Sequence, residues 1–303
     1  MDVDDEAAAM YRALPGDLGD RLRNVLRDTE DGTVMEIENG RCPMWRQDGL
    51  CRIQAELGHD GLCKTCREFP RLRHDYGDFV ELGLELSCPE AARLILGSDG
   101  GFITESVPGD EIAEYDRETM DVLLESRREA LDFLCRGNCT LPEALAALLL
   151  YGYDTQAQID GAAESSSPVD CLAEVHSFDC EGDMGAVFSF FSELEILTDN
   201  WRSRLQQKPV AIAWTPSLNA LARYMIERYW LQAISDYDLV CRVKLMIIAC
   251  LLVGALGGDP VQTAQLFSKE IENNSDNIEA VLDGAYTAAA LTDANLLGLL
   301  LKG

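Results

Sequence analysis

The sequence predicts a mainly α-helical protein with a small β element beside a group of cysteines. Hydrophobic residues make up 47% of the 303 residues, which is enough to bury a substantial core. Most of the chain beyond residue 100 repeats apolar residues at helical spacing. Five of the 11 cysteines fall between positions 42 and 88, where periodicity is weak and Gly and Pro are frequent. That segment is typical of loops and short turns held together by something other than a hydrophobic core.

The first hundred residues mix predicted helix and strand. Residues 5–29 carry leucines at four-residue spacing, which predicts a helix. A short strand is expected at 33–37, and alternating apolar residues predict a half-buried strand over 79–86. The segment 87–90 is typical of a capping box, and a helix is expected to follow it through Leu96.

The glycine-rich segment 97–101 ends that helix and predicts the domain boundary. We therefore expect a cysteine-cluster metal-binding region over 1–100 and an all-helical region over 101–303. The helices expected in the second region span residues 110–135, 141–151, 183–200, 217–234, 238–257, 260–274 and 277–301.

The charge balance excludes several classes of partner. The chain has 53 acids and 25 Lys and Arg residues, a net charge of -28, which excludes a protein that binds nucleic acid through its overall charge. The same balance argues against adhesion to an anionic membrane surface. The acidic N-terminus resembles no signal peptide, and the longest apolar run, 245–256, is too short to span a bilayer. We expect a cytoplasmic protein with reduced thiols.

The clustered cysteines predict a metal centre. They are spaced Cys42-x8-Cys51-x11-Cys63-x2-Cys66-x21-Cys88, and four thiolates suit either Zn²⁺ or an iron–sulfur cluster. Seven bases and four acids over 41–73 give a local charge of +3, which could offset the negative charge of such a centre. Five cysteines exceed the four ligands needed, so one is spare or the site is more complex. The alternative is a set of buried, inert cysteines.

Two groups of segments resemble the flagellin lysine-N-methylase family, and part of the first group is shared with zinc- or iron-chelating cysteine-cluster proteins. The first group comprises 42–45 (CPMW), 48–54 (DGLCRIQ), 56–58 (ELG), 62–71 (LCKTCREFPR) and 86–93 (LSCPEAAR). The second is 267–277 (FSKEIENNSDN). Because the two groups lie far apart in the chain, the resemblance favours the methylase family over the small chelators. Members of the family usually have a further cysteine-rich segment upstream. By the resemblance, either the start of this sequence is misassigned or the chain is a shortened form.

The resemblance implies an activity and two cofactors. It implies a protein-lysine N-methyltransferase that uses S-adenosyl-L-methionine, acts on flagellin of the bacterial flagellum and carries an iron–sulfur cluster, expected to be 4Fe-4S, with zinc as the alternative. Carried over onto this sequence, it implies Cys42, Cys51, Cys66 and Cys88 as metal ligands, with Cys63 as the substitute. Two other functions stay open: a non-catalytic zinc- or iron-binding scaffold, and an iron–sulfur redox protein.

Methyl transfer to lysine needs groups that remove a proton from the amine. The candidates are Glu270, Glu272 and Asn277, in or next to the second matched segment. Glu270 and Asn277, seven residues apart, would share a helical face, whereas Glu272 would point elsewhere. The alternative places these acids on a solvated surface, with a cap from Ser275 or Asn277. Tyr224 and Trp230 are candidates for holding adenine or a lysine stem, and core packing is their alternative role.

Overall fold

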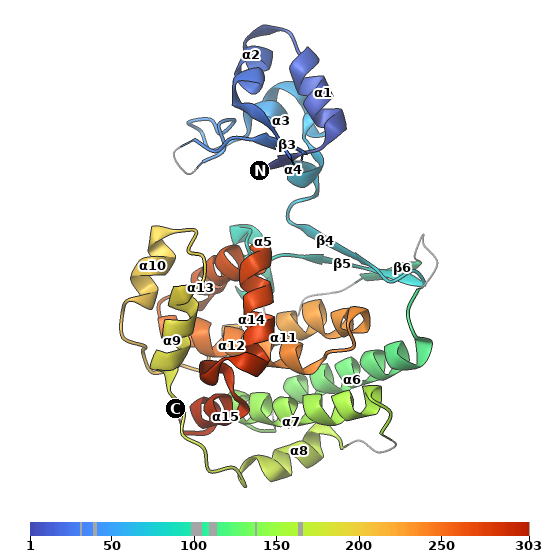
Figure 1. Cartoon of the computed structure of the whole chain (residues 1–303), viewed down its shortest axis with the longest axis vertical. Coiled ribbons are helices and arrows are strands. Elements are labelled where there is room, and N and C mark those ends of the chain that lie inside the picture. The colour runs from blue at the N-terminus through green and yellow to red at the C-terminus, as the bar shows by residue number, and fades with distance from the viewer. Residues whose placement is uncertain are drawn as a thin grey trace. The chain divides into compact units, whose positions relative to one another are not determined.

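The computed structural model describes residues 1–30, 32–38, 41–97, 105–108, 114–136, 138–162 and 166–302, and it separates into two compact units, Met1–Leu72 and Arg73–Gly303. Helices dominate the described residues, and the strands form two small sheets (Figure 1). The mainly α prediction is therefore confirmed.

The first unit is a small sheet and short helices around a core of its own. Its elements are β1 (Asp2–Val3), α1 (Asp5–Ala13), α2 (Gly16–Val25), β2 (Leu26–Thr29), β3 (Gly32–Met35), α3 (Arg52–Leu57), the 3₁₀ turn η1 (His59–Gly61) and α4 (Lys64–Glu68). The sheet order is β1-β3-β2, with both neighbours of β3 antiparallel to it. Tyr11, Leu22 and Met35 are among its most deeply buried side chains.

The helix expected over 5–29 is interrupted. Leu14 adopts an extended conformation, as the residue before a proline tends to do, and α2 begins only after Pro15. The last four residues of the predicted helix form strand β2 instead. The strand expected at 33–37 is present as β3, shifted by one to two residues.

A second sheet has the order β4-β5-β6, formed by β4 (Arg71–Asp75), β5 (Phe79–Leu84) and β6 (Glu105–Pro108). Strand β5 confirms the strand predicted over 79–86, but its buried face differs from the expected one. Val80 is buried as expected, whereas Leu82 is exposed and Glu81 is only 5% exposed. A buried glutamate requires a partner, and that partner comes from the helical layer described below.

The second unit packs its helices around α12. The elements after β5 are α5 (Pro89–Gly97), α6 (Arg117–Arg136), α7 (Leu141–Ile159), α8 (Pro168–Val175), α9 (Met184–Glu193), α10 (Asp199–Leu205), α11 (Pro216–Tyr229), the 3₁₀ segment η2 (Trp230–Ser235), α12 (Val240–Leu256), α13 (Pro260–Phe267), the π-helical segment η3 (Ser268–Glu272), α14 (Ser275–Thr287), the 3₁₀ turn η4 (Ala289–Leu291) and α15 (Asp293–Lys302). Nearly all of α12 is buried, and α7, α11, α13 and α14 pack against it (Figure 1). None of the described helices combines the length and apolar character needed to cross a membrane.

Local signals locate several helix starts correctly. The capping box of Thr140 and Glu143 opens α7. A second box, formed by Ser167 and Asp170, opens α8, which the sequence pattern did not predict. The helix expected over 183–200 is divided into α9 and α10, and those expected over 260–274 and 277–301 are divided by η3 and η4.

The division between the units lies between Leu72 and Arg73, earlier than the boundary expected at residue 100. Helix α5 contacts α11 and α13, and its buried residues Ala92 and Ile95 belong to the core of the second unit. The side chain of Gln265 also donates a hydrogen bond to the carbonyl of Ser87 at 2.6 Å. These contacts assign β5 and α5 to the helical unit. The expected boundary at 97–101 falls mostly outside the described residues.

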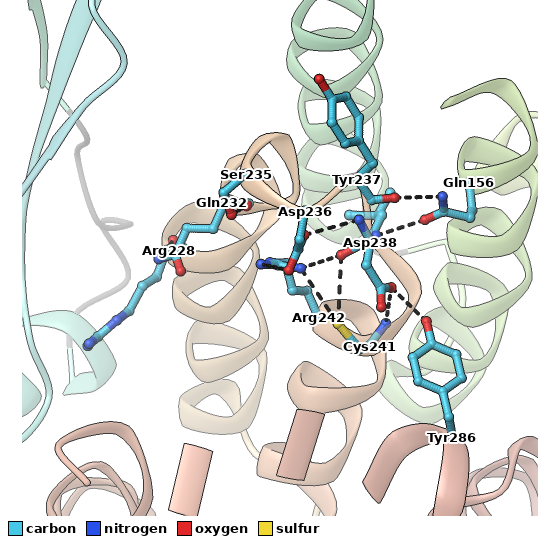
Figure 2. Close-up of polar contacts among 11 residues, drawn as sticks. Gln156, Arg228, Gln232, Ser235, Asp236, Tyr237, Asp238, Cys241, Arg242 and Tyr286 are labelled. Carbon is cyan, nitrogen blue, oxygen red and sulfur yellow. Dashed lines mark hydrogen bonds and ion pairs between the residues drawn. The ribbon is translucent and has the colours of Figure 1, made fainter. Parts of the chain in front are cut away.

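A strained turn connects η2 to α12 (Figure 2). Tyr237 is the one described residue other than glycine with a positive φ, +60°, and its side chain is 47% exposed. Gln156 of α7 holds the turn: its Nε2 donates to the carbonyl of Tyr237 at 2.8 Å, and its Oε1 accepts from the amide of Leu239 at 2.8 Å. Arg242 donates to Asp236, and Tyr286 donates to Asp238 at 2.6 Å. The network therefore stabilises a backbone conformation that L-residues disfavour.

We expect Tyr237→Gly to raise the free energy of unfolding by about 1 kcal/mol, because glycine adopts a positive φ without steric cost. Tyr237→Ala is the control, since it removes the same exposed ring and keeps the strain. Chemical denaturation of the three proteins measures the difference. Equal stability of the Gly and Ala variants would contradict the strain at this residue.

Candidate metal centre and buried acid cluster

Three of the predicted metal ligands line one cavity in the first unit. Cys42, Cys51 and Cys66 face a space of about 400 Å³, together with Met1, Met44, Trp45 and Phe69. Cys42 lies in the loop after β3, and Cys51 precedes the first residue of α3. A single antiparallel bridge between Trp45 and Cys51 closes the loop that carries these two cysteines. Thiols separated in sequence are thus brought to the same cavity.

Cys63 belongs to the same group. It precedes the first residue of α4 and is 1% exposed, and Cys66 follows one helical turn later. A hydrogen bond from Cys66 lowers the pKa of Cys63 to about 6. Burial raises the pKa of Cys42, and the nearby Cys51 and Cys63 raise it further. The same thiols, with burial as the larger cause, raise the pKa of Tyr11. The four cysteines of the first unit are therefore electrostatic neighbours.

Cys88 belongs to the other compact unit. Cys88 lies directly before α5 in the second unit, where it packs against the helical core. The four cysteines gathered in one compact unit are Cys42, Cys51, Cys63 and Cys66. Cys63, expected only as a substitute ligand, takes the place in this group that the resemblance gave to Cys88.

The thiols are not in metal-binding geometry. Within the described part of the chain, no three or more Cys, His, Asp or Glu residues are arranged to hold a metal ion. The Sγ of Cys42 lies 4.0 Å from the Sδ of Met35, and that of Cys66 lies 3.6 Å from the Sδ of Met1. The sequence predicts that five thiols converge, and four of them lie together in the first unit. A bound metal stays a prediction. Four soft donors around one cavity are chemically suited to zinc or an iron–sulfur cluster.

Two of the predicted catalytic residues, Glu270 and Asn277, fix a neighbouring segment. The carboxylate of Glu270 accepts hydrogen bonds from the amide of Leu197, at 2.8 Å, and from the hydroxyl of Thr198. The side chain of Asn277 accepts from the amide of Glu195 and donates to its carbonyl, at 3.1 and 2.8 Å, and it also donates to the carbonyl of Glu270. Both residues therefore position the segment 195–198.

The solvated-surface interpretation of these acids is wrong. Glu270 is completely buried, and Glu272 is 9% exposed as a residue and 0% exposed in its side chain. The expected cap also differs, because Asn274 caps α14, with its side chain accepting from the amide of Asn277. The turn that carries the acids is π-helical rather than α-helical, which the sequence pattern did not indicate.

Glu272 is the centre of a buried polar group. Its Oε1 accepts hydrogen bonds from the hydroxyls of Tyr229, at 2.9 Å, and Tyr224, at 3.3 Å, and lies 3.2 Å from a guanidinium nitrogen of Arg228. Its Oε2 is buried without a hydrogen-bond partner among the described residues. Burial, reinforced by the charge of Glu272, raises the pKa of both tyrosines.

Tyr224 and Trp230 occupy the core. Tyr224 is 0% exposed and Trp230 is 2% exposed, and the indole of Trp230 donates to the hydroxyl of Ser126 at 3.0 Å. The geometry thus supports core packing, the alternative role, rather than stacking on a ligand from solvent.

Sequence reasoning missed a second buried ionic group next to these residues. The guanidinium of Arg127, on α6, forms two hydrogen bonds with the carboxylate of Glu81, at 2.9 and 2.6 Å. Glu227 of α11 is near this pair, and its side chain is 9% exposed. The only sequence signal for these residues was the four-residue spacing of Arg223 and Glu227 on one helical face.

Comparisons with known proteins relate part of this chain to proteins named lysine-N-methylase. No family model and no solved structure matches the chain. The chain is 33% identical over 132 residues to the lysine-N-methylases of Salmonella typhimurium and Salmonella choleraesuis, a match that covers 41% of this chain and 32% of each relative. It is also 46% identical over 57 residues to the flagellar biosynthetic protein FliU of Salmonella muenchen, over 19% of this chain and 34% of that protein.

The molecule is thus a mainly helical protein with a small unit that gathers four cysteines. It is related in sequence to the lysine-N-methylases, which confirms the resemblance inferred from its motifs. The matched segment spans about a third of the length of these curated relatives.

We expect Arg127→Met to lower the free energy of unfolding by about 3–5 kcal/mol, because it leaves the buried carboxylate of Glu81 without its partner. The neighbouring Arg128→Met is the control: Arg128 is 64% exposed, and its loss should cost no more than about 0.5 kcal/mol. Adding Glu81→Gln to Arg127→Met should recover most of the loss. Equal stability of the two single variants in denaturant titrations would contradict a structural role for the pair.

Proposed function

We propose that this chain is a protein-lysine N-methyltransferase that moves a methyl group from S-adenosyl-L-methionine to lysine side chains of flagellin. The observation that carries the proposal is the similarity to two proteins named lysine-N-methylase. The flagellar name of the third relative supports a flagellar protein as the substrate. The cytoplasm, where flagellin is made before export, is the proposed place of action.

The reaction sets the demands on the site. A lysine side chain titrates near about 10.4 in water, and its ammonium form has no lone pair with which to attack. The enzyme must therefore take up a proton, shield the free amine from water and align nitrogen, methyl carbon and sulfur. In the second unit, the buried carboxylate of Glu272 holds Tyr229 and Arg228 of α11 through its Oε1, so it acts by positioning that helix. Glu270 and Asn277 act by positioning the segment 195–198.

We propose that Cys42, Cys51, Cys63 and Cys66 hold a metal centre, a 4Fe-4S cluster in our first choice and zinc in the second. The supporting observation is that three of these thiols line one cavity and the fourth is hydrogen-bonded to one of the three. Methyl transfer to an amine requires no electron, so the centre would supply cross-linking of the loops over 42–66 rather than redox chemistry.

A non-catalytic metal-binding scaffold is the second candidate function. The observation in its favour is that the first unit has its own hydrophobic core, so it could serve as a separate binding module. This candidate predicts bound metal without measurable binding of S-adenosylmethionine in calorimetry.

For the metal centre, we expect Cys63→Ala to lose most of the metal found in the unmodified protein, because it removes one of four clustered thiols. Cys88→Ala should retain the metal, since Cys88 belongs to the other unit. Cys241→Ala, a buried cysteine in α12, is the control. Iron, sulfide and zinc analysis with a visible spectrum, on protein purified without oxygen, measures the outcome. Loss of metal from the Cys88 variant alone would restore the ligand set implied by the resemblance.

For the activity, we expect methyl-sized mass gains on flagellin lysines after incubation of the metal-replete protein with S-adenosylmethionine and flagellin. Peptide mass spectrometry identifies the modified residues, and a reaction without S-adenosylmethionine is the control. Unmodified flagellin, with S-adenosylmethionine bound or unbound, would count against the methyltransferase.

A further inference from the structure

A cluster of buried ionisable groups in the second unit has several polar atoms without hydrogen-bond partners. Strands β4 and β5 contribute His74 and Glu81, and helix α6 contributes Arg127. Helix α11 contributes Arg223, Glu227 and Arg228, and η3 contributes Glu272. The buried atoms with no partner among the described residues include His74 Nε2, Arg223 Nε, Glu227 Oε2, Arg228 Nε and Glu272 Oε2. Buried polar groups are nearly always paired, so a local group of exceptions needs an explanation, such as a bound ligand or a catalytic role.

Glu227 has fewer short contacts than the other buried glutamates of this unit. Glu272 also has an Oε2 without a partner among the described residues, but its Oε1 contacts Tyr224, Tyr229 and Arg228 at 2.9 to 3.3 Å. The carboxylate of Glu81 takes two short hydrogen bonds from Arg127, and that of Glu270 takes two from the segment 195–198. Among the described residues, the one ion pair of the Glu227 carboxylate is with the guanidinium of Arg223, at 3.7 Å from Oε1, although nine-tenths of the Glu227 side chain is buried. A carboxylate kept for structure would be expected to carry the partners that Glu81 and Glu270 have.

The surroundings of Glu227 bring the pKa of its carboxyl close to neutral pH. Burial, the largest cause, raises the pKa of its carboxyl to about 7, although the charges of Arg223 and Arg127 oppose the rise; the charge of Glu81 contributes to it. On the β4 side, burial, followed by the charge of Arg228, lowers the pKa of His74. A group that titrates close to neutral pH suits proton transfer in either direction.

We propose that Glu227 is the catalytic residue that accepts a proton from the substrate amine before methyl transfer. The inference rests on the proposed methyltransferase function and assigns one step of it. The carboxylate of Glu227 takes a proton from the lysine ammonium, which leaves a neutral amine. The nitrogen lone pair then bonds to the sulfonium methyl carbon, and the carbon–sulfur bond breaks with its electron pair going to sulfur. The products are S-adenosylhomocysteine and a methyl-lysine ammonium, and Glu227 returns its proton to water.

Arg223 marks the partly exposed side of Glu227. The side chain of Arg223 is 25% exposed, and its separation from Glu227 is long for an ion pair. An incoming amine could therefore displace the guanidinium toward solvent without breaking a short hydrogen bond. Arg127 of α6 is paired with Glu81, so an incoming amine would not compete with Arg127 for the carboxylate of Glu227.

The test compares Glu227→Gln with Glu279→Gln, an exposed glutamate on α14, in the full chain with its metal. We expect E227Q to lower kcat by about 100-fold or more, with a KM for flagellin close to that of the unmodified protein. The unmodified rate should rise with pH through about 7, and E227Q should lose that rise. E279Q should change neither quantity.

A second readout does not depend on activity. The pKa of the Glu227 carboxyl is higher in the folded state, at about 7, than in the unfolded state. Such a carboxyl lowers the free energy of unfolding as pH rises from the unfolded-state pKa to the folded-state pKa. Above the folded-state pKa the loss of stability is constant. E227Q should therefore unfold at higher denaturant concentration than the unmodified protein at about pH 8, with the difference shrinking toward about pH 5. E279Q should follow the unmodified protein.

The outcomes separate the inference from the function on which it rests. An active E227Q beside an active unmodified protein would overturn the role of Glu227 and leave the methyltransferase in place. An unmodified protein that does not methylate flagellin would overturn both. Identical pH dependence of unfolding in E227Q and the unmodified protein would show that Glu227 is not held as a buried, poorly paired carboxyl, and that too would overturn the inference.

Discussion

Buried carboxylates tie the helical unit together, and the rest of its architecture depends on their being satisfied. Glu81 connects β5 to α6 through Arg127, and Glu270 connects η3 to the segment before α10. Glu272 connects η3 to α11 through Tyr229 and Arg228. A buried charge costs several kcal/mol unless it is paired, so each of these contacts is demanded by the burial itself. Segments far apart in the sequence are thereby fixed to one another in one arrangement.

The two units differ in the size of the hydrophobic core that stabilises them. The second has a large core in which α12 is nearly all buried, so its helices gain stability from packing. The first has a core of few residues for its 72, and the loops that carry Cys42 and Cys51 contribute little to it. Units of this size commonly need a cross-link or a metal in addition to a core. The cavity beside the thiols lies where such a cross-link would act.

The sequence pattern predicted what periodicity and capping encode. It predicted the helical character of the second region and the start of α7, because apolar spacing and the Thr140 capping box are local signals. It also indicated that the early cysteines converge. The resemblance implied Cys88 as a further ligand, and that role stays a prediction. The packing of α5, which follows Cys88, on α11 and α13 is a tertiary preference that no spacing encodes.

The limits of prediction are clearest at the charged positions. Alternation along β5 favoured Leu82 as an inward residue, yet Glu81 is the buried one, because Arg127 offers it a bidentate partner from a helix that begins 36 residues later. The alternative interpretation placed Glu270 and Glu272 on a solvated surface, whereas a π-helical turn buries both. In each case long-range hydrogen bonds or ion pairs outweighed the local hydrophobic pattern.

Glu227 is the position where this rule of paired burial is broken. The fold supplies bidentate or multiple partners to Glu81, Glu270 and Glu272, so it has the means to satisfy a buried carboxylate. It gives Glu227 one distant guanidinium and holds its carboxyl where it titrates near neutral pH, at a cost in stability. Groups kept at such a cost are found where reactivity depends on the strain, since a fully paired glutamate would have neither the free oxygen nor the affinity to take a proton from an amine.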